Sequence, residues 1–412
     1  MRAKRQSVIQ KFCSALITAL AAASPAHAAL VNVTSLVTDD QGAHSALITD
    51  PKLVNAWGVS SSPTSPFWVS DNGSGIATLY RVDPGTNAPT KMGLEVSIPG
   101  DGSVTGQVFN ANSSIGAFNG DPFLFVSEDG TVSGWRAALG TAAETLQLGS
   151  SDNVYKGTTQ ATTGGFSYLY AANFRAGRID VIKGSSGAPD LTGNFIDPNL
   201  PAGYAPFNIQ RIGSELYVTY AQQDGNKLDD VAGAGHGVVN AFDLQGNLLR
   251  RVASQGTLNS PWGLALAPSS FGTLAGDLLV GNFGDGHINV FDSSDVFVGQ
   301  LLGPNSDPLA IDGLWALIAG NGGNAGNPQS VYFSAGPDGE THGLFGVISF
   351  ASDSTSVPEP ATLALLGLGL AGLAASRRRQ WSGASDPGSA PRKEGARKKR
   401  VDPDSNSLGL QA

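Results

Sequence analysis

The chain has one cysteine among its 412 residues, at position 13. Cys13 lies in an apolar stretch, residues 12–23, that follows a basic N-terminus and precedes Ala26-His27-Ala28. This order predicts a signal peptide for the Sec machinery, residues 1–28, cut after Ala28. A buried N-terminal helix is the alternative. The exported protein then has no thiol, which excludes disulfide bonds and cysteine-ligated metals.

Basic residues are scarce in the body of the chain. Residues 29–356 carry 12 Lys and Arg against 29 Asp and Glu, a net charge of −17, whereas the whole chain has −9. Such a surface excludes nucleic acid as a partner, because phosphates need a basic footprint. It favours solubility and association with cations. Abundant glycine and the lack of long helical periods predict an all-β domain.

The C-terminal part has three consecutive segments. Pro358, Glu359 and Pro360 precede fifteen uncharged residues, 361–375, and then three arginines at 377–379. The apolar run predicts a short transmembrane helix, with the arginines in the cytoplasm and the domain outside. Residues 380–412 form a polar, basic tail that we expect to be disordered.

The segment 357–379 resembles the PEP-CTERM sorting signal of Gram-negative bacteria, in which Pro358, Glu359 and Pro360 mark cleavage by an exosortase. The resemblance implies export across the inner membrane and a precursor anchored in the membrane by its C-terminal helix. It also implies final sorting to the cell surface or extracellular matrix, with exosortase as a partner. A plain C-terminal anchor is the alternative. Members of that family usually stop just after the basic cluster, so the tail 380–412 departs from their pattern.

Short apolar strands recur along residues 29–356. Six units begin near positions 55, 107, 153, 206, 260 and 312, with further strands between turns rich in Gly and Asp. A period of about fifty residues with four strands per unit predicts a six-bladed β-propeller, rather than a β-sandwich pair. The third unit's fourth strand is predicted at 194–196. The last unit lacks one, and we expect residues 31–37 to supply it and close the ring.

Several segments of this domain resemble an uncharacterised bacterial propeller family that often carries a PEP-CTERM end and is more distantly similar to NHL-type propellers. They are Ser260-Pro261-Trp262-Gly263, residues 280–286, Asp312-Gly313-Leu314-Trp315, residues 334–337 with 342–346, and residues 220–237. The resemblance implies the fold and the sorting route, but no activity.

In such a fold, the loops between second and third strands and the loops leading into each blade open on one face. These loops are polar and acidic here, and include Glu128 and Glu340. Ligand sites favour the mouths of closed β architectures. The predicted ligand-binding residues are Asn55, Asp71, Asn72, Asn173, Asn282, Asp285, Asp312 and Asp338.

Three histidines, His236, His287 and His342, precede the third strand in three consecutive blades. With the acidic loop that holds Asp224, Asp229 and Asp230, they predict a site for Ca²⁺ or another divalent metal. The alternative is that repeated turns place similar residues at similar positions, too far apart to share an ion. The acidic loop is then simply solvated.

Trp57, Trp262 and Trp315 recur at the first strands, either as core wedges or as an aromatic floor for a sugar or peptide. The sequence has no serine nucleophile elbow, phosphate loop or zinc-protease helix. It therefore favours a non-enzymatic binding or scaffold protein for exopolysaccharide or other surface proteins. The alternative is a metal-dependent hydrolase or lyase that uses the acidic face.

Overall fold

A computed structural model describes residues 30–351 of the chain. The predicted signal peptide with Ala26 and Ala28, the transmembrane helix at 361–375 and the tail at 380–412 lie outside the described residues. Within the described part, no helix is long and apolar enough to cross a membrane.

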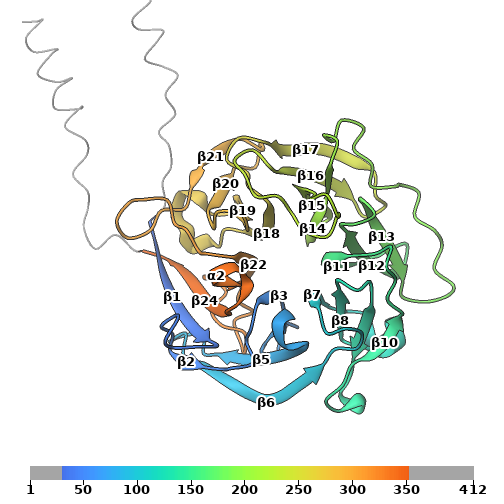
Figure 1. Cartoon of the computed structure of the whole chain (residues 1–412), viewed down its shortest axis with the longest axis horizontal. Helices are drawn as coiled ribbons and strands as arrows, with labels where there is room; N and C mark the ends of the chain where they lie inside the picture. The colour runs from blue at the N-terminus through green and yellow to red at the C-terminus, as the bar shows by residue number, and fades with distance from the viewer. Residues whose placement is uncertain (1–29, 352–412) are drawn as a thin grey trace, which may run out of the picture. The chain divides into compact units, whose positions relative to one another are not determined.

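Six antiparallel sheets surround a central shaft, with the first strand of each sheet nearest the centre (Figure 1). This confirms the predicted all-β, six-bladed propeller. Blades 1 to 3 contain β3 (Ala56–Ser60), β4 (Phe67–Asp71), β5 (Ile76–Val82), β6 (Pro89–Ser97); β7 (Val104–Phe109), β8 (Phe123–Ser127), β9 (Val132–Trp135), β10 (Glu144–Gln147); and β11 (Tyr155–Thr163), β12 (Phe166–Asn173), β13 (Arg178–Lys183).

The other three blades follow the same order from the centre outward. They contain β14 (Tyr204–Ile212), β15 (Glu215–Gln222), β16 (Val238–Asp243), β17 (Leu248–Ser254); β18 (Pro261–Leu266), β19 (Leu278–Asn282), β20 (Ile288–Phe291), β21 (Phe297–Gln300); and β22 (Leu314–Ala319), β23 (Val331–Ala335), β24 (Leu344–Phe350). Short helices lie in the loops: η1 (Asn72–Ser74), η2 (Ser113–Ile115), η3 (Ala117–Gly120), η4 (Ala137–Leu139), η5 (Ser269–Leu274) and α2 (Pro337–Glu340).

The N-terminal strand closes the ring, as the sequence predicts. β1 (Val31–Thr38) pairs antiparallel with β24, with Val33 opposite Ile348, and the short β2 (Ile48–Thr49) pairs parallel with β1 (Figure 1). Blade 6 is therefore built from both ends of the propeller. Its β24 edge is paired, not exposed, which removes an edge that would promote aggregation.

The predicted fourth strand of blade 3, at 194–196, is wrong, because the third sheet has only three strands. The backbone N–H groups of Gly193 and Phe195 donate instead to the carbonyls of Gln245 and Gly246, in the neighbouring blade. Phe195 has φ 56°, which a strand does not allow, and its ring packs 5.3 Å from that of Phe242. Burial of this aromatic ring between blades replaces strand pairing.

The first strand of every blade carries a β-bulge near its start. A bulge inserts extra residues and redirects a side chain. The residue after the bulged one is usually small, because the first strands of adjacent blades lie very close together. A Cβ on Gly58, for example, would lie 2.5 Å from the Thr105 carbonyl oxygen. The bulged residues, which surround the shaft, are Trp57, Thr105, Lys156, Phe207, Trp262 and Trp315.

Ring closure predicts that β1 carries much of the stability. Leu36 of β1 is fully buried with Phe67 and Phe345, between blades 1 and 6. We expect Leu36→Ala to lower the free energy of unfolding by about 2–5 kcal/mol, through lost burial and a cavity. Asn32→Ala, on the exposed side of the same strand, is the control and should change it by less than about 0.5 kcal/mol. Denaturant unfolding measures both, and equal stabilities would contradict a closing role for β1.

Candidate functional site

The face that carries α2, η1 and the loops after the second strands is called here the upper face. Four of its side chains meet over the shaft. Asn55 Nδ2 donates to Glu340 Oε2 at 2.7 Å and to Asn72 Oδ1 at 3.3 Å, and Asn72 Nδ2 donates to Glu128 Oε2 at 3.2 Å. Loops of blades 1, 2 and 6 thus converge, as the alternation of strands and loops predicts.

A buried lysine lies below these side chains. Lys156 Nζ donates to Glu128 and to Asp229 Oδ1, and lies 5.1 Å from the centre of the Trp57 ring. Burial alone would lower the pKa of Lys156, but the carboxylates of Glu128 and Asp229 raise it above its ordinary value. Lys156 is therefore a fixed positive charge. The term central cluster denotes Asn55, Asn72, Glu128, Lys156, Asp229 and Glu340.

Sequence reasoning missed Lys156. It occupies the bulged first-strand position, where four of the other blades place an aromatic residue. A charged residue at a position that the repeat fills with tryptophan or phenylalanine is the signal that could have identified it.

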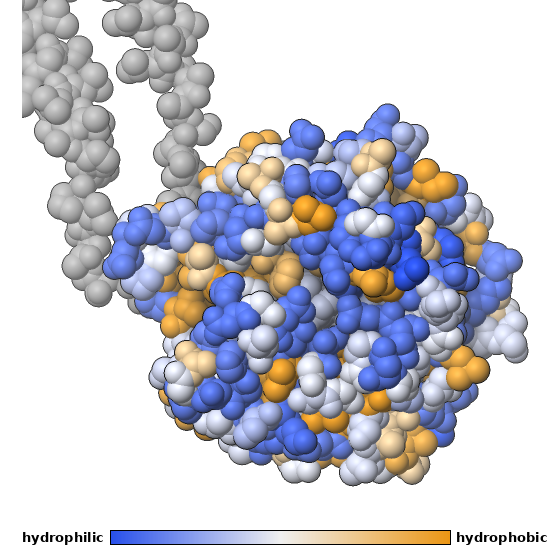
Figure 2. Space-filling view, in the orientation of Figure 1, coloured by the Kyte–Doolittle hydropathy of each residue, from blue (hydrophilic) through white to orange (hydrophobic). Residues whose placement is uncertain are grey.

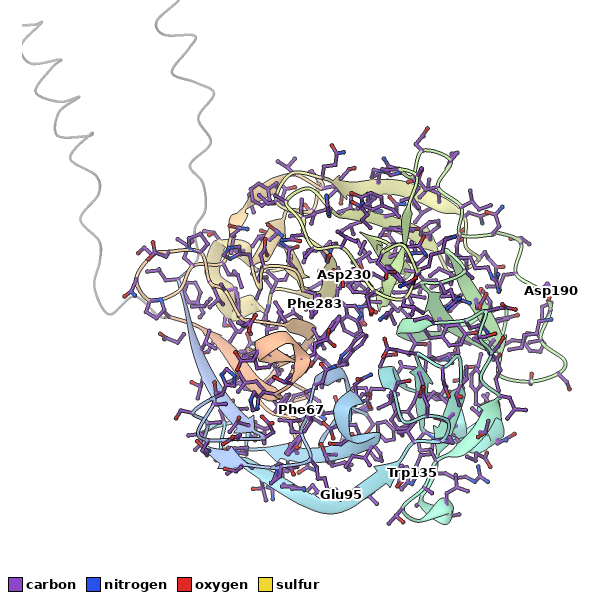
Figure 3. All side chains as sticks on the ribbon, in the orientation of Figure 1. Phe67, Glu95, Trp135, Asp190, Asp230 and Phe283 are labelled. Atoms are coloured by element: carbon purple, nitrogen blue, oxygen red, sulfur yellow. The ribbon has the colours of Figure 1, made fainter. Side chains whose placement is uncertain are left out.

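Stacked aromatic rings close the shaft beneath the central cluster. The rings of Trp57 and Trp315 lie 3.7 Å apart, and Phe283 stacks on Trp315 at 3.9 Å. Asn55 Oδ1 accepts hydrogen bonds from Nε1 of Trp57 and of Trp315, at 2.9 and 3.2 Å. Both tryptophans are buried, whereas Phe283 is half-buried and lies near the centre of the disc (Figure 3). Phe283 is thus the most exposed of the three stacked rings.

The mouth above this floor is acidic. Glu128, Asp229, Asp230 and Glu340 surround the single ammonium of Lys156. Burial raises the pKa of Glu340 and of Asp230, while Lys156 opposes both shifts. The surrounding surface of this face is mostly hydrophilic (Figure 2).

The loop that carries Glu340 is strained and braced. Asp338, Gly339 and Glu340 all have left-handed backbone conformations, with φ of 55°, 65° and 67°. Such angles are unfavourable for residues other than glycine, so surrounding contacts must hold them. Two contacts come from the segment after β1: His44 Nε2 to Asp338 Oδ2 at 2.9 Å, and His342 Nδ1 to Asp39 Oδ2 at 3.0 Å.

Asp312 and Asp338, two predicted ligand residues, belong to this brace. Asp312 Oδ2 accepts the backbone N–H of Asp338 at 2.8 Å. The hydrogen bond to Asp39 raises the pKa of His342, which favours the charged pair. Asp312 and Asp338 are both exposed, but their contacts hold the loop that positions Glu340.

Asn173, Asn282 and Asp285, three other predicted ligand residues, make hydrogen bonds that fix the conformations of loops. Asn173 donates to Asn153 Oδ1 at 2.8 Å and to Asp180 Oδ2 at 2.7 Å. Asn282 donates to Asp285 Oδ1 at 3.0 Å. Asn173 and Asn282 are buried, and only Asp285 is exposed. Of the eight predicted ligand residues, the structure brings Asn55 and Asn72 together at the centre.

Asp71, also predicted, is fully buried at the end of β4 in blade 1. Within the described residues its carboxyl oxygens accept no hydrogen bond, because the hydroxyl of the adjacent Thr78 donates to Tyr80. Burial raises the pKa of Asp71 well above its ordinary value, and the nearby Asp50 adds to this. Asp71 is inaccessible to a ligand in this structure.

The three histidines have separate partners. His236 Nδ1 contacts the Val231 carbonyl at 2.7 Å, His287 Nδ1 contacts the Leu309 carbonyl at 2.9 Å, and His342 pairs with Asp39. Residues 30–351 contain no group of three or more His, Cys, Asp and Glu side chains placed to hold a metal ion. Metal binding by these histidines stays a prediction.

The acidic loop at residues 224–230 is held largely by hydrogen bonds within the loop. Asp224 Oδ1 accepts the backbone N–H of Leu228 at 2.8 Å, and Asp229 pairs with Lys156. Asp230 lies against the central cluster, where Lys156 lowers and Asp229 raises its pKa as secondary effects after burial. Of the predicted metal ligands, Asp229 and Asp230 thus reach the centre.

Known proteins resemble the chain in two regions. Residues 356–379 match the PEP-CTERM protein-sorting motif. Two uncharacterized proteins of Acanthamoeba polyphaga mimivirus are similar over most of their length. One is 32% identical over 327 residues, 75% of this chain and 77% of the relative, and the other 33% identical over 318 residues, 72% and 80%.

The chain belongs to the family of these two proteins. Among solved structures, a streptogramin B lyase covers 73% of this chain and 95% of its own at 12% identity, with a TM-score of 0.43. The sorting motif, which includes Pro358, Glu359 and Pro360, makes the chain an exported protein. Its precursor is anchored in the membrane and sorted to the cell surface by an exosortase.

The unpartnered Asp71 predicts a pH-dependent stability. Because its folded pKa is raised, folding is most favourable when Asp71 is protonated, and stability falls as pH rises from about 4, the unfolded pKa, towards the folded pKa. Asp71→Asn should therefore raise the melting temperature at pH 7–8 and lose this advantage near pH 4. Asp307→Asn, at an exposed aspartate, is the control and should change the melting temperature little at any pH. A gain that is the same at every pH would contradict this account.

The buried charge of Lys156 predicts that its removal lowers the stability of the fold considerably. Lys156→Met leaves Glu128 without its cation, and breaking a buried ion pair costs about 3–5 kcal/mol. We expect the lower end of that range, because Glu128 is partly exposed. Lys183→Met, which breaks an exposed pair with Asp190, is the matched control and should leave the melting temperature unchanged. Equal effects in thermal unfolding would refute a structural role for the buried charge.

Proposed function

We propose that this exported protein is a binding protein of the cell surface or extracellular matrix, and that it holds an extracellular polymer at the central cluster. The observation that carries the proposal is the convergence of Asn72, Glu128 and Glu340 around Asn55, which also binds the stacked indoles of the aromatic floor. The half-buried ring of Phe283 belongs to that floor. A shaft mouth with convergent polar groups and an aromatic surface is the usual form of a ligand site in closed β folds.

The chemistry of the mouth favours hydroxyl and ammonium groups. Carboxylates accept hydrogen bonds from both, and the amide of Asn72 both donates and accepts. The ring of Phe283 can pack against the carbon face of a sugar. The excess of acidic groups over Lys156 repels polyanions. A neutral or amine-bearing polysaccharide therefore fits better than an acidic one.

Backbone strain at the same place supports a functional role. Asn55 and Glu340, which hydrogen-bond to each other, both have positive φ, 46° and 67°. Glycine would adopt these angles at lower energy, so the side chains are retained at a conformational cost. Strained residues of this kind concentrate in ligand sites.

The same geometry favours binding over the metal-dependent hydrolase or lyase considered as the alternative. The ammonium of Lys156 already lies between Glu128 and Asp229, where a cation would neutralise them. The cluster has its own positive charge. It can orient a ligand through hydrogen bonds without recruiting an ion.

Retention on polysaccharide tests the proposal. The full chain is passed over immobilised exopolysaccharide of the producing strain, separated into neutral, amine-bearing and acidic fractions. We expect retention on a neutral or amine-bearing fraction, and Glu340→Gln and Asn72→Ala should weaken it about tenfold, equivalent to about 1.4 kcal/mol.

Asp190→Asn is the control, since Asp190 lies at the rim of the disc (Figure 3). Its retention should equal that of the wild type. If wild type and cluster variants wash through alike, the proposal fails. If a surface protein is captured at the cluster and no polysaccharide is, the partner class is wrong.

A further inference from the structure

The shaft also opens on the lower face, opposite the central cluster, where the first strands end. A cavity of about 280 Å³ lies there, bounded by blades 1 to 4 and 6. A smaller cavity of about 20 Å³ continues from it into the shaft, and the two share Val59, Gln107, Gln210 and Ile318. The smaller one is lined by Trp262 and is large enough for about one water molecule.

The lower cavity differs chemically from the upper mouth. Its lining contains no Asp or Glu, and Arg211 is its one charged residue. Amides and hydroxyls, among them Gln160, Gln210 and Thr159, share the lining with apolar side chains such as Ile318. An otherwise strongly acidic domain thus has, on this face, an amphiphilic mouth that lacks carboxylates and carries one cationic residue.

Two polar groups at this end have no partner within the described residues. Trp262 Nε1 is buried, with its side chain 5% exposed, and donates to no acceptor. Gln210 borders both cavities, and its side chain makes no hydrogen bond in this part of the chain. The neighbouring Gln107 is already engaged, since its amide donates to the Gly58 carbonyl and Ser70 and accepts from Ser60. The amide of Gln210 is therefore free to bind something that enters, whereas Trp262 Nε1 is covered by its neighbours.

We propose that the lower mouth is a second binding site, which takes an uncharged, hydroxyl-rich group such as the terminal residue of a neutral saccharide. Hydroxyl groups both donate and accept, so they match the amide of Gln210, and the residue Trp262 lines the smaller cavity just beyond it. The carbon face of a sugar packs on Val59 and Ile318. The lining has no carboxylate to neutralise an amine. This site does not depend on the function proposed for the upper mouth.

Tryptophan resonances distinguish the two mouths. The full chain is labelled with ¹⁵N at its indole groups, and each signal is assigned by a Trp→Phe variant. The labelled protein is then titrated with neutral trisaccharides built from glucose, galactose, mannose or rhamnose. It is titrated separately with a glucosamine oligomer and a glucuronate oligomer. We expect a neutral trisaccharide to shift the Trp262 signal saturably and to leave Trp57 and Trp315, which lie under the central cluster, unchanged.

Variants separate this proposal from the upper site. Gln210→Leu should weaken binding about tenfold, as read from Trp262, without changing the melting temperature, because the Gln210 side chain makes no hydrogen bond within residues 30–351. Glu340→Gln, at the upper mouth, should titrate at Trp262 as the wild type does. A lower site is refuted if no sugar shifts Trp262, if Trp57 and Trp315 respond instead, or if Gln210→Leu binds normally. Tighter binding of the glucuronate or glucosamine oligomer would overturn the neutral ligand class.

Discussion

The amide of Asn55 ties the aromatic floor of the shaft to the polar groups above it. Its oxygen accepts from two indole N–H groups and its nitrogen donates to Glu340 and Asn72, so all four of its hydrogen-bonding positions are used. A buried amide that is satisfied on every side stabilises one arrangement over others. Blades 1 and 6, which meet at this residue, are thereby fixed in register at the shaft.

The bulge in each first strand explains how a repeated fold produces an asymmetric centre. Every blade directs one bulged residue at the shaft, but the sequence varies that residue from tryptophan to threonine to lysine. Four aromatic residues fill the axis, while Lys156 introduces charge from blade 3. The architecture repeats and the chemistry does not.

The sequence predicted most of the fold. Six spaced units and a spare N-terminal strand were enough, because strand alternation and the need to cover a sheet edge are local and general constraints. The irregular blade 3 could not be predicted. There a buried Phe195 outweighs strand pairing, and that preference depends on Tyr170 and Phe242, distant in sequence.

The candidate site was predicted only in part. The loop alternation correctly placed Asn55 and Asn72 on one face, and Glu340 with them. It did not separate exposed residues from those that fasten loops, such as Asn173, or from buried ones, such as Asp71. Those distinctions depend on side-chain packing between blades, which a repeat pattern does not encode. Predicting the position of Lys156 at the shaft would have required knowing where the bulge falls in each first strand.

The pairing of β1 with β24 has a kinetic consequence. The two strands of the closing blade lie at opposite ends of the propeller, with Val33 opposite Ile348. Contacts so distant in sequence form late, because loop closure loses entropy before the contact compensates for it. While the chain emerges on the far side of a membrane, β1 stays unpaired until β24 has been translocated. During that interval both edges stay open, so the rate of translocation sets how long the nascent protein is vulnerable to aggregation.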